Sequence, residues 1–228
     1  MNVWSSTLLA TLGSIVVYGF ARLIYARRPS ILTLPIVVTA AVVSAVLVLA
    51  KTDVSQYARA ARPLSWLLGP ATIALAVPLH RNRELLRKRA RTIALSVTVG
   101  ALVGLCSAVL LARVLHLPRQ VQLSLAPKSV TTPIAMPIAE RIGGNPSLTA
   151  GIVVLTGMFG LAFGARLLTR FGVNDRIARG LAFGTSTHAI GTVSALSESA
   201  ESGAASAVAL VLAGIVTALA APFLVRLL

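Results

Sequence analysis

Long apolar stretches alternate along this chain with short clusters of charged residues. A membrane-spanning helix needs about 20 mostly apolar residues, and six stretches reach or approach that length. They lie near residues 4–22, 31–50, 64–80, 92–112, 148–168 and 204–225. The third stretch is short and is interrupted by Pro70 and Pro78. The pattern predicts an all-α polytopic membrane protein with about six spanning helices.

Two further segments, 124–142 and 177–197, are too polar and too rich in proline or glycine to be ordinary lipid-facing spans. Lipid offers no partner for a freed backbone group, so irregular chain persists at membrane depth only where protein or a water-filled cavity surrounds it. We therefore expect two re-entrant or broken helical hairpins. Residues 51–62 mix charged and small apolar side chains, which suits either a surface-lying helix or an ordinary loop.

The basic residues indicate how the two polar segments are inserted. With the N-terminus outside and segment 124–142 returning to the outer face, thirteen of the twenty-one lysines and arginines fall inside, as the usual bias requires. These are Arg22, Arg27, Arg28, Arg81, Arg83, Arg87, Lys88, Arg89, Arg91, Arg166, Arg170, Arg176 and Arg179. A complete span at 124–142 would put the last four outside. The re-entrant form is therefore favoured, with a broken full span left open, and segment 177–197 then enters from the cytoplasmic side.

Two polar segments that approach the midplane from opposite faces are typical of an inverted-topology repeat in secondary transporters, where broken helices form the substrate site. A shift of 57 positions places Ser129 on Ser186 and Ala150 on Ala207, which supports such a repeat only mildly. We divide the chain into N-terminal helices with a surface segment at 1–63, a scaffold or oligomerisation unit, and a transport core at 64–228.

Composition narrows the possible functions. Hydrophobic residues make up 56% of the 228 positions and charged residues 12%. The net charge of +15 is carried in short loops beside the apolar stretches, which marks the cytoplasmic side and argues against a nucleic-acid partner. The single cysteine, Cys106, cannot form an intramolecular disulfide. The sequence has no P-loop, metal-ligand motif or nucleophile elbow, so we expect no enzyme, metal site or cofactor.

The first polar segment combines one lysine with three hydroxyl residues. Prolines lack an amide hydrogen and clash with the carbonyl four residues earlier, so we expect the helix to break and leave carbonyl groups unpaired. The expected breaks are at Pro127, Pro133 and Pro137. A small carboxylate would suit the lysine, the hydroxyls and the amides of a half-helix starting there. The candidate substrate-binding residues are Lys128, Ser129, Thr131 and Thr132. Alternatively, the lysine extends to the outer interface and the threonines bond to their own helix.

The second polar segment is rich in glycine, which permits close backbone approach. Its candidate substrate-binding residues are Thr185, Ser186, His188 and Thr192, with backbone breaks at Gly184 and Gly191. The histidine could bind substrate or carry a coupled proton, since its unperturbed pKa is about 6.5. A packing role is the equally weighted alternative. Glu198 and Glu201 are expected to be solvated charges at the end of this hairpin.

These motifs resemble the LrgB/CidB family of bacterial membrane proteins. The match rests on residues 127–136, the sequence Ile142-Gly143-Gly144 and residues 184–192, and it extends over nearly the whole chain. The resemblance implies a bacterial cytoplasmic membrane protein with antiholin-like control of murein hydrolases and autolysis, and a smaller partner of the LrgA/CidA type. It also implies transport, because related systems move pyruvate, and a plastid relative moves glycolate and glycerate.

Two positions depart from the family's pattern. Relatives often have a basic residue where Ser194 stands and a tyrosine where His80 stands. If that basic residue helps to neutralise a carboxylate, this chain binds a different substrate or binds it more weakly.

We therefore expect a carrier of small monocarboxylates such as pyruvate or glycolate that works by alternating access, with coupling to H⁺ or Na⁺ left open. The alternative is a holin- or antiholin-like oligomeric modulator of murein hydrolase activity and membrane permeability. A pore needs a continuous polar stripe along one span, whereas polarity here is concentrated in two interrupted segments. Small residues at 204–209 permit close helix contact, and we expect a homodimer.

Overall fold

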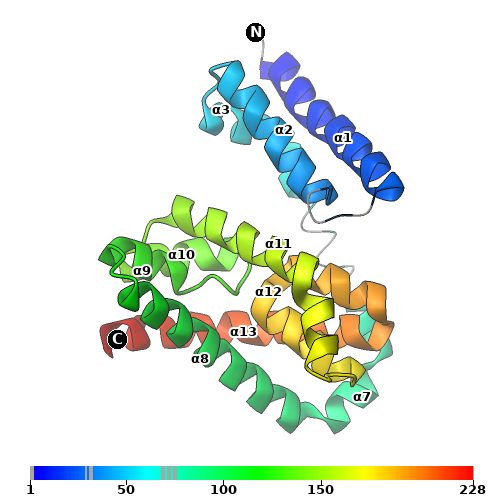
Figure 1. Cartoon of the computed structure of the whole chain (residues 1–228), viewed down its shortest axis with the longest axis vertical. Coiled ribbons are helices and arrows are strands. Elements are labelled where there is room, and N and C mark those ends of the chain that lie inside the picture. The colour runs from blue at the N-terminus through cyan, green and yellow to red at the C-terminus, as the bar shows by residue number, and fades with distance from the viewer. Residues whose placement is uncertain are drawn as a thin grey trace. The chain divides into compact units, whose positions relative to one another are not determined.

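The computed structural model describes residues 3–28, 30, 33–67, 70, 73 and 76–227, which are mostly helical and contain no strand (Figure 1). The chain divides into two compact units, residues 1–74 and 75–228, so the predicted boundary at residue 63 falls inside the first. Four helices are long and apolar enough to span a membrane. The predicted all-α membrane protein is confirmed, with fewer full-length spans among the described residues than the six predicted. The predicted span 64–80 lies partly outside the described residues.

The first unit packs α1 (Val3–Arg27) along α2 (Pro35–Leu49), with the short helices α3 (Val54–Ala60) and α4 (Arg62–Trp66) beside α1. The 15 residues of α2 extend about 22 Å, which is shorter than the bilayer's apolar layer of about 30 Å. Residues 54–60 take the helical option expected for segment 51–62, because the Asp53 side chain accepts a hydrogen bond from the Ser55 amide at 2.9 Å.

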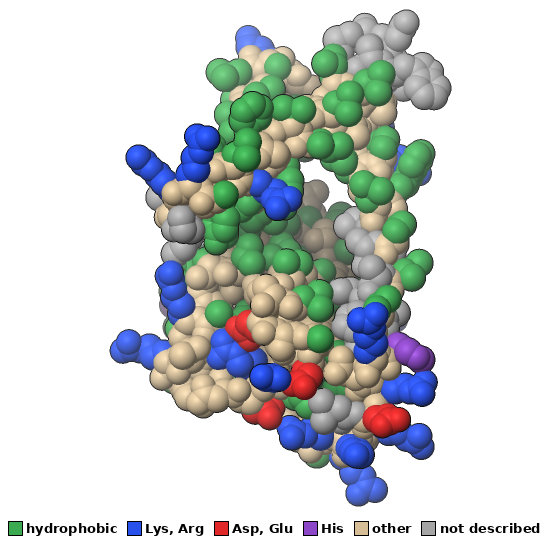
Figure 2. Space-filling model, turned by 90° about the vertical axis from the view of Figure 1, so that its right-hand side faces the viewer, with side chains coloured by type: hydrophobic (Ala, Val, Ile, Leu, Met, Phe, Trp, Pro, Cys, Tyr) green, Lys and Arg blue, Asp and Glu red, His purple; other side chains and the backbone are tan. Residues whose placement is uncertain are grey.

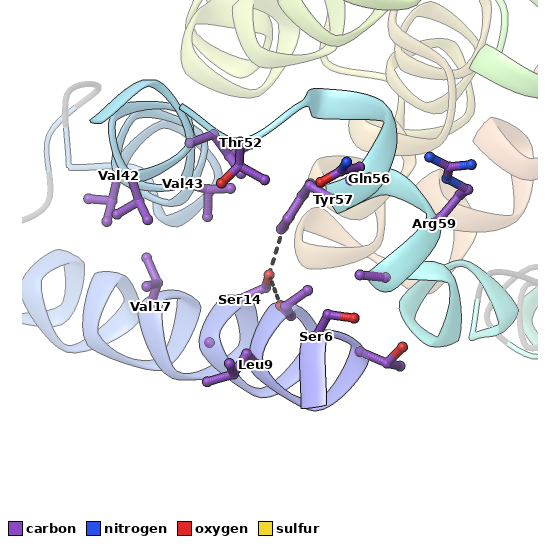
Figure 3. Close-up of a pocket in the computed structure, with 16 residues that line it drawn as sticks. Ser6, Leu9, Ser14, Val17, Val42, Val43, Thr52, Gln56, Tyr57 and Arg59 are labelled. Atoms are coloured by element: carbon purple, nitrogen blue, oxygen red, sulfur yellow. Dashed lines mark hydrogen bonds between the residues drawn. The ribbon is translucent and has the colours of Figure 1, made fainter. Parts of the chain in front are cut away.

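A groove of about 1050 Å³ lies between α1, α2 and α3 (Figure 3). Valines from α1 and α2 line one part of it, among them Val17 and Val42, while polar side chains including Gln56 line the part beside α3. A hydrogen bond of 2.7 Å joins the hydroxyls of Ser14 and Tyr57 across the groove and ties α3 to α1.

The second unit is built around three long helices, α8 (Ala90–Val114), α11 (Pro146–Arg170) and α13 (Ala200–Leu227). Arg89, just before α8, forms an ion pair of 3.2 Å with Asp175, which follows α11. The N-terminus of α8 therefore lies beside the C-terminus of α11, and the two helices run antiparallel. Short helices α6 (Ala76–Arg81) and α7 (Arg83–Lys88) precede α8, and α6 packs against α13.

The long helices of the second unit are apolar on the surface as well as in the core. On α8, Leu95, Val99 and Val103 are each more than half exposed, whereas Val97 and Val109 are fully buried. Exposed leucine and valine along a helix of this length are costly in water and favourable in lipid. The pattern is that of a bundle surrounded by a bilayer.

The first polar segment forms what we call the first hairpin, made of α9 (Arg119–Leu125), a non-helical stretch at 126–131, and α10 (Thr132–Ile142). Ser124, near the end of α9, is hydrogen-bonded to the chain that follows α10. The Asn145 amide donates to Ser124 Oγ at 2.8 Å, and Thr149 Oγ1 donates to the Ser124 carbonyl at 3.0 Å. A complete span would separate residues 124 and 145 by about the thickness of the bilayer. The closure at Ser124 therefore supports the re-entrant form over a broken full span.

Of the three prolines expected to break the first hairpin, only Pro127 lies where the chain is not helical. Pro133 stands in the first turn of α10, where no helical partner exists for its missing amide, and the helix continues through Pro137 to Ile142. The chain departs from helix upstream, at 126–131, which includes Pro127. The helix thus begins at Thr132, directly before Pro133, instead of breaking at this proline.

Gly144 allows the first hairpin to close, which leads to a stability prediction. A Cβ at this position would lie 2.9 Å from the Ser124 backbone nitrogen, so Gly144→Ala is expected to destabilise the protein by about 1–3 kcal/mol through overpacking. Gly151→Ala is the control, because a Cβ there meets nothing within 4 Å. Thermal unfolding in detergent compares the two, and equal midpoints would contradict the tight closure at Ser124.

The second polar segment lies in α12 (Arg176–Glu198), whose backbone leaves helical geometry at Thr187 (φ −131°, ψ 16°) and His188 (φ 46°, ψ −141°). Arg179 and Glu198 would be about 28 Å apart along a straight helix, yet Arg179 Nη2 lies 2.6 Å from Glu198 Oε1. The break therefore reverses the chain, and α12 is a second hairpin with arms at 176–186 and 189–198. The predicted broken helix is confirmed, with its break between Gly184 and Gly191.

Candidate functional site

The two hairpins enter the second unit from opposite ends. The first closes at Asn145, beside the N-terminus of α11. The second has its base at the other end of α11, where Arg179 Nη2 donates to the Ala165 carbonyl at 3.2 Å. Their tips, residues 126–131 and 186–189, therefore point towards each other along the bundle.

Residues of both hairpins pack against glycines in the middle of α8. A Cβ at Gly100 would lie 3.0 Å from Thr185 Cγ2, and a Cβ at Gly104 would lie 3.5 Å from Ser129 Oγ. The two glycines are one turn apart, about 6 Å along the helix axis, and they flank the midpoint of α8. Ser129 of the first hairpin and Thr185 of the second thus reach the same depth in the bundle.

The tip of the second hairpin also packs against two glycines in the middle of α11. A Cβ at Gly157 would lie 2.9 Å from His188 Cε1, and a Cβ at Gly160 would collide with the Thr187 side chain. Both glycines lie close to the midpoint of α11. In a bilayer the midpoint of a spanning helix lies near mid-membrane, so the broken backbone of the second hairpin is placed at that depth and is surrounded by protein, as such backbone requires.

Lys128 is the candidate cation of the first tip. It is half-buried, and its ammonium group donates to Ser129 Oγ at 3.2 Å. Among the described residues no carboxylate forms an ion pair with it. Thr131 and Thr132, both half-buried, stand at the start of α10, and the Thr131 side chain does not cap that helix. The first tip and the start of α10 therefore place a cation without an ion-pair partner in the described structure, three hydroxyls and a helix N-terminus together.

His188 and Thr192 hold the bend of the second hairpin. His188 is 3% exposed, and its Nε2 lies 2.9 Å from the Val153 carbonyl of α11, a contact in which the ring nitrogen donates. Thr192 Oγ1 donates to the His188 carbonyl at 3.1 Å and lies 2.9 Å from Ser206 Oγ of α13. His188 Nε2 and the Thr192 hydroxyl are therefore both hydrogen-bonded to other groups of the protein.

The other hydroxyls of the second tip point in different directions. Thr185 is buried against α8, whereas Ser186 is exposed and donates to the Ala182 carbonyl of its own helix at 2.6 Å. Thr187, which the sequence analysis did not select, is buried in the bend and donates to the Phe183 carbonyl. Ser206 was also missed, since nothing in the apolar stretch 204–225 distinguishes it.

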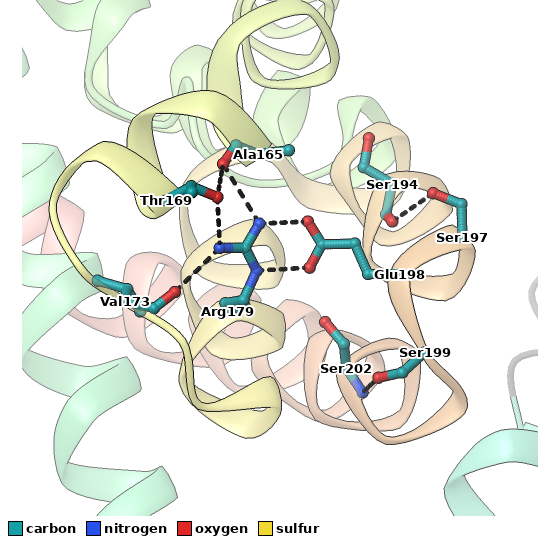
Figure 4. Close-up of polar contacts among 9 residues, drawn as sticks. All are labelled: Ala165, Thr169, Val173, Arg179, Ser194, Ser197, Glu198, Ser199 and Ser202. Atoms are coloured by element: carbon teal, nitrogen blue, oxygen red, sulfur yellow. Dashed lines mark hydrogen bonds and ion pairs between the residues drawn. The ribbon is translucent and has the colours of Figure 1, made fainter.

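Arg179 fixes the base of the second hairpin (Figure 4). Its Nε and Nη2 donate to the two carboxylate oxygens of Glu198 at 2.7 and 2.6 Å. Its Nη1 donates to the Val173 carbonyl at 2.9 Å and to Thr169 Oγ1 at 3.2 Å. One guanidinium thus joins both arms to the end of α11. Glu198, expected as a solvated charge, is held by this arginine.

Asp175 begins the second hairpin. Its carboxylate accepts the Ala178 amide at 2.8 Å and an Arg89 hydrogen bond at 3.2 Å. Both bonds lower the pKa of the Asp175 carboxyl below its usual range, and the hydrogen bond from the Ala178 amide has the larger effect. The N-terminal end of α12 and the start of α8 therefore stay joined at neutral pH. Within the described part of the chain, no three metal-ligating side chains are grouped.

The sequence is similar to a family profile and to several known bacterial proteins. A profile of the LrgB-like family matches residues 14–227. YwbG of Bacillus subtilis is 41% identical over 211 residues, which cover 92% of this chain and 94% of YwbG. The antiholin-like protein LrgB of Bacillus subtilis is 37% identical over 164 residues, 72% of this chain and 71% of LrgB. The holin-like protein CidB of Staphylococcus aureus is 28% identical over 228 residues, 100% of this chain and 99% of CidB.

No solved structure matches the chain. The family profile covers well over half of the sequence, and the relatives align along most of their own length. The long helices α8, α11 and α13 and the two hairpins lie inside the matched region, which also includes the second half of α1. This membrane protein therefore belongs to the LrgB-like family.

Proposed function

We propose that the protein carries small monocarboxylates across the membrane by alternating access. The observation that supports this is the meeting of two re-entrant tips, inserted from opposite ends, at the middle of α8. Broken helices that meet at this depth form substrate sites in secondary transporters. The opposite insertion also supports an inverted-topology repeat, with the hairpins as equivalent elements.

Lys128 supports a carboxylate as the substrate group. A half-buried ammonium without an ion-pair partner in the described structure favours a bound anion over a neutral solute. The Ser129 hydroxyl lies within hydrogen-bonding distance of it, and the start of α10 adds amides suited to an anion. Pyruvate and glycolate are small enough for such a site, and Thr185 would face them from the second tip.

The orientation is part of the proposal. Ten basic residues lie at the end of the second unit that holds the base of the second hairpin, against four at the opposite end. We place this basic end in the cytoplasm, in a bacterial cytoplasmic membrane, because basic loops stay on that side. The first hairpin then opens from the outer face.

The names of the relatives support a second candidate function better than they support a carrier. LrgB of Bacillus subtilis is called antiholin-like and CidB of Staphylococcus aureus holin-like. On that basis the protein would act as a homo-oligomer, with or without a smaller membrane partner, to change membrane permeability and murein hydrolase activity.

Uptake of labelled pyruvate and glycolate into proteoliposomes holding only this chain separates the two candidates, with and without pH and Na⁺ gradients. A carrier is expected to give saturable, competable uptake. Lys128→Met should reduce it about 10- to 100-fold, because a hydrogen bond to a charged group is worth about 1.5–3 kcal/mol. Lys51→Met, at an exposed site of the first unit, is the control. Non-saturable leakage of unrelated solutes would support the holin-like candidate, and unaltered uptake in Lys128→Met would remove Lys128 from the site.

A further inference from the structure

We propose that residues 80–91 form a binding surface for the phosphate groups of anionic phospholipids. This segment covers the end of α6, all of α7 and the start of α8. Six of its twelve residues are lysine or arginine and one, Glu84, is acidic. The basic residues are Arg81, Arg83, Arg87, Lys88, Arg89 and Arg91, and all six are exposed.

The segment is held in place by the buried side chain of Leu86. Leu86 is 7% exposed and packs in the core cluster that includes Ile93 and Val97 of α8 and Ile177 of α12. This contact fixes α7 at the N-terminus of α8, while the cations around it face outward. The surface is therefore preorganised and does not need to fold when a ligand binds.

The cations lie at the depth of lipid headgroups. Leu95, 68% exposed, is the first strongly exposed large apolar residue of α8 after the basic segment. It follows Arg91 by four residues, about 6 Å along the helix. Because such residues on a spanning helix face hydrocarbon, the segment directly before them lies among the phosphates. Figure 2 shows lysine and arginine side chains gathered around the lower part of the second unit, with acidic side chains between some of them.

The protein neutralises only part of this positive charge itself. Asp175 is paired with Arg89, Glu198 with Arg179, and Glu201 with Arg176. The remaining cations of the segment have no ion-pair partner within the described residues, and Glu84 offsets only one of them. Those five are Arg81, Arg83, Arg87, Lys88 and Arg91. Clusters of unpaired cations directly beside a spanning helix attract anionic headgroups.

Native mass spectrometry of the full-length chain tests this surface directly. The detergent-purified protein is mixed with equal amounts of phosphatidylglycerol and phosphatidylcholine, and the bound lipids are counted. The test variant combines Arg83→Gln, Arg87→Gln and Lys88→Gln. The control combines Arg113→Gln, Arg141→Gln and Arg226→Gln, three exposed arginines outside the segment. Each cation near an anionic surface contributes severalfold to binding, so the test variant is expected to lower the ratio of phosphatidylglycerol to phosphatidylcholine about tenfold or more.

Several outcomes would overturn the proposal. They are an unchanged ratio in the test variant, an equal loss in the control, or displacement of phosphatidylglycerol by millimolar inorganic phosphate, which would indicate a site for free anions. Should the triple variant fail to give monodisperse, helical protein, the Arg87→Gln and Lys88→Gln double variant is expected to show a smaller loss in the same direction. Because the readout is bound lipid, the result is independent of whether the protein transports carboxylates.

Discussion

Replacing Arg179 by alanine is expected to lower the free energy of unfolding by about 3 kcal/mol and to release the second hairpin. The side chains of Arg179 and Glu198 are only 13% and 23% exposed and meet in a bidentate ion pair. Removing the arginine leaves a mostly buried carboxylate without its partner, which costs about 3–5 kcal/mol in fully buried pairs. It also frees the carbonyls of Ala165 and Val173. Thermal unfolding of the purified chain in detergent measures the loss.

Arg176 supplies a control for this prediction on the same arm. It pairs with Glu201 at 3.3 Å, but the two side chains are 68% and 39% exposed. Exposed pairs contribute about 0–1 kcal/mol, so Arg176→Ala is expected to be nearly neutral. A double-mutant cycle with Glu198→Ala should give a coupling energy of about 2 kcal/mol for Arg179 and a few tenths for Arg176 with Glu201→Ala. Equal effects of Arg179→Ala and Arg176→Ala would show that this ion pair does not hold the hairpin.

The long helices were predictable because the length of an apolar stretch is a local property. The stretches 92–112, 148–168 and 204–225 correspond to α8, α11 and α13, and each observed helix is longer by two to four residues at its ends. The added residues include Pro146, which follows the N-cap Asn145. Polar and proline signals of this kind lie outside an apolar window, so hydropathy alone ends each helix too early.

The location of the bend in α12 could not be read from local sequence. Glycine weakens a helix wherever it stands, and Gly184 and Gly191 offered two equivalent candidates. The observed break at Thr187 and His188 is selected by contacts distant in sequence, namely His188 with Val153 and Arg179 with Glu198. In the first hairpin, by contrast, the departure from helix at 126–131 includes Pro127, one of the predicted breaks, whereas α10 continues through Pro137.

The sequence indicated at which depth in the bundle the candidate site lies, but not in which direction each of its side chains points. Polar residues inside apolar sequence indicated Ser129 and Thr185, and both lie at the middle of α8. The direction of each hydroxyl depends on neighbouring turns, so Ser186 faces outward and Thr187 inward although both are hydroxyl residues in the same run. Which of these side chains is buried depends on packing against α11 and α13. The hydrophobic periodicity of the sequence does not show this where a helix is broken.

Gly180 and Gly184 are the positions where one added methyl group should have the largest effect. They stand four residues apart on the first arm of the second hairpin and face α13. A Cβ at Gly180 would collide with the Ser202 carbonyl oxygen, and a Cβ at Gly184 with that of Ser206. Small residues at this spacing let two helix backbones approach closely in a membrane. Because the obstacles are backbone atoms, α13 cannot relieve the collision by changing a side-chain rotamer.

Gly180→Ala and Gly184→Ala are therefore each expected to destabilise the protein by about 3 kcal/mol, the upper part of the range for overpacking. The double variant should yield little monodisperse protein on size-exclusion chromatography. Gly19→Ala, where a Cβ meets nothing within 4 Å, should behave like the wild type. The arm also carries Thr185 and leads to His188, so partial separation from α13 should reduce uptake before the protein unfolds. Wild-type stability in both single variants would mean that the arm and α13 are further apart than the structure places them.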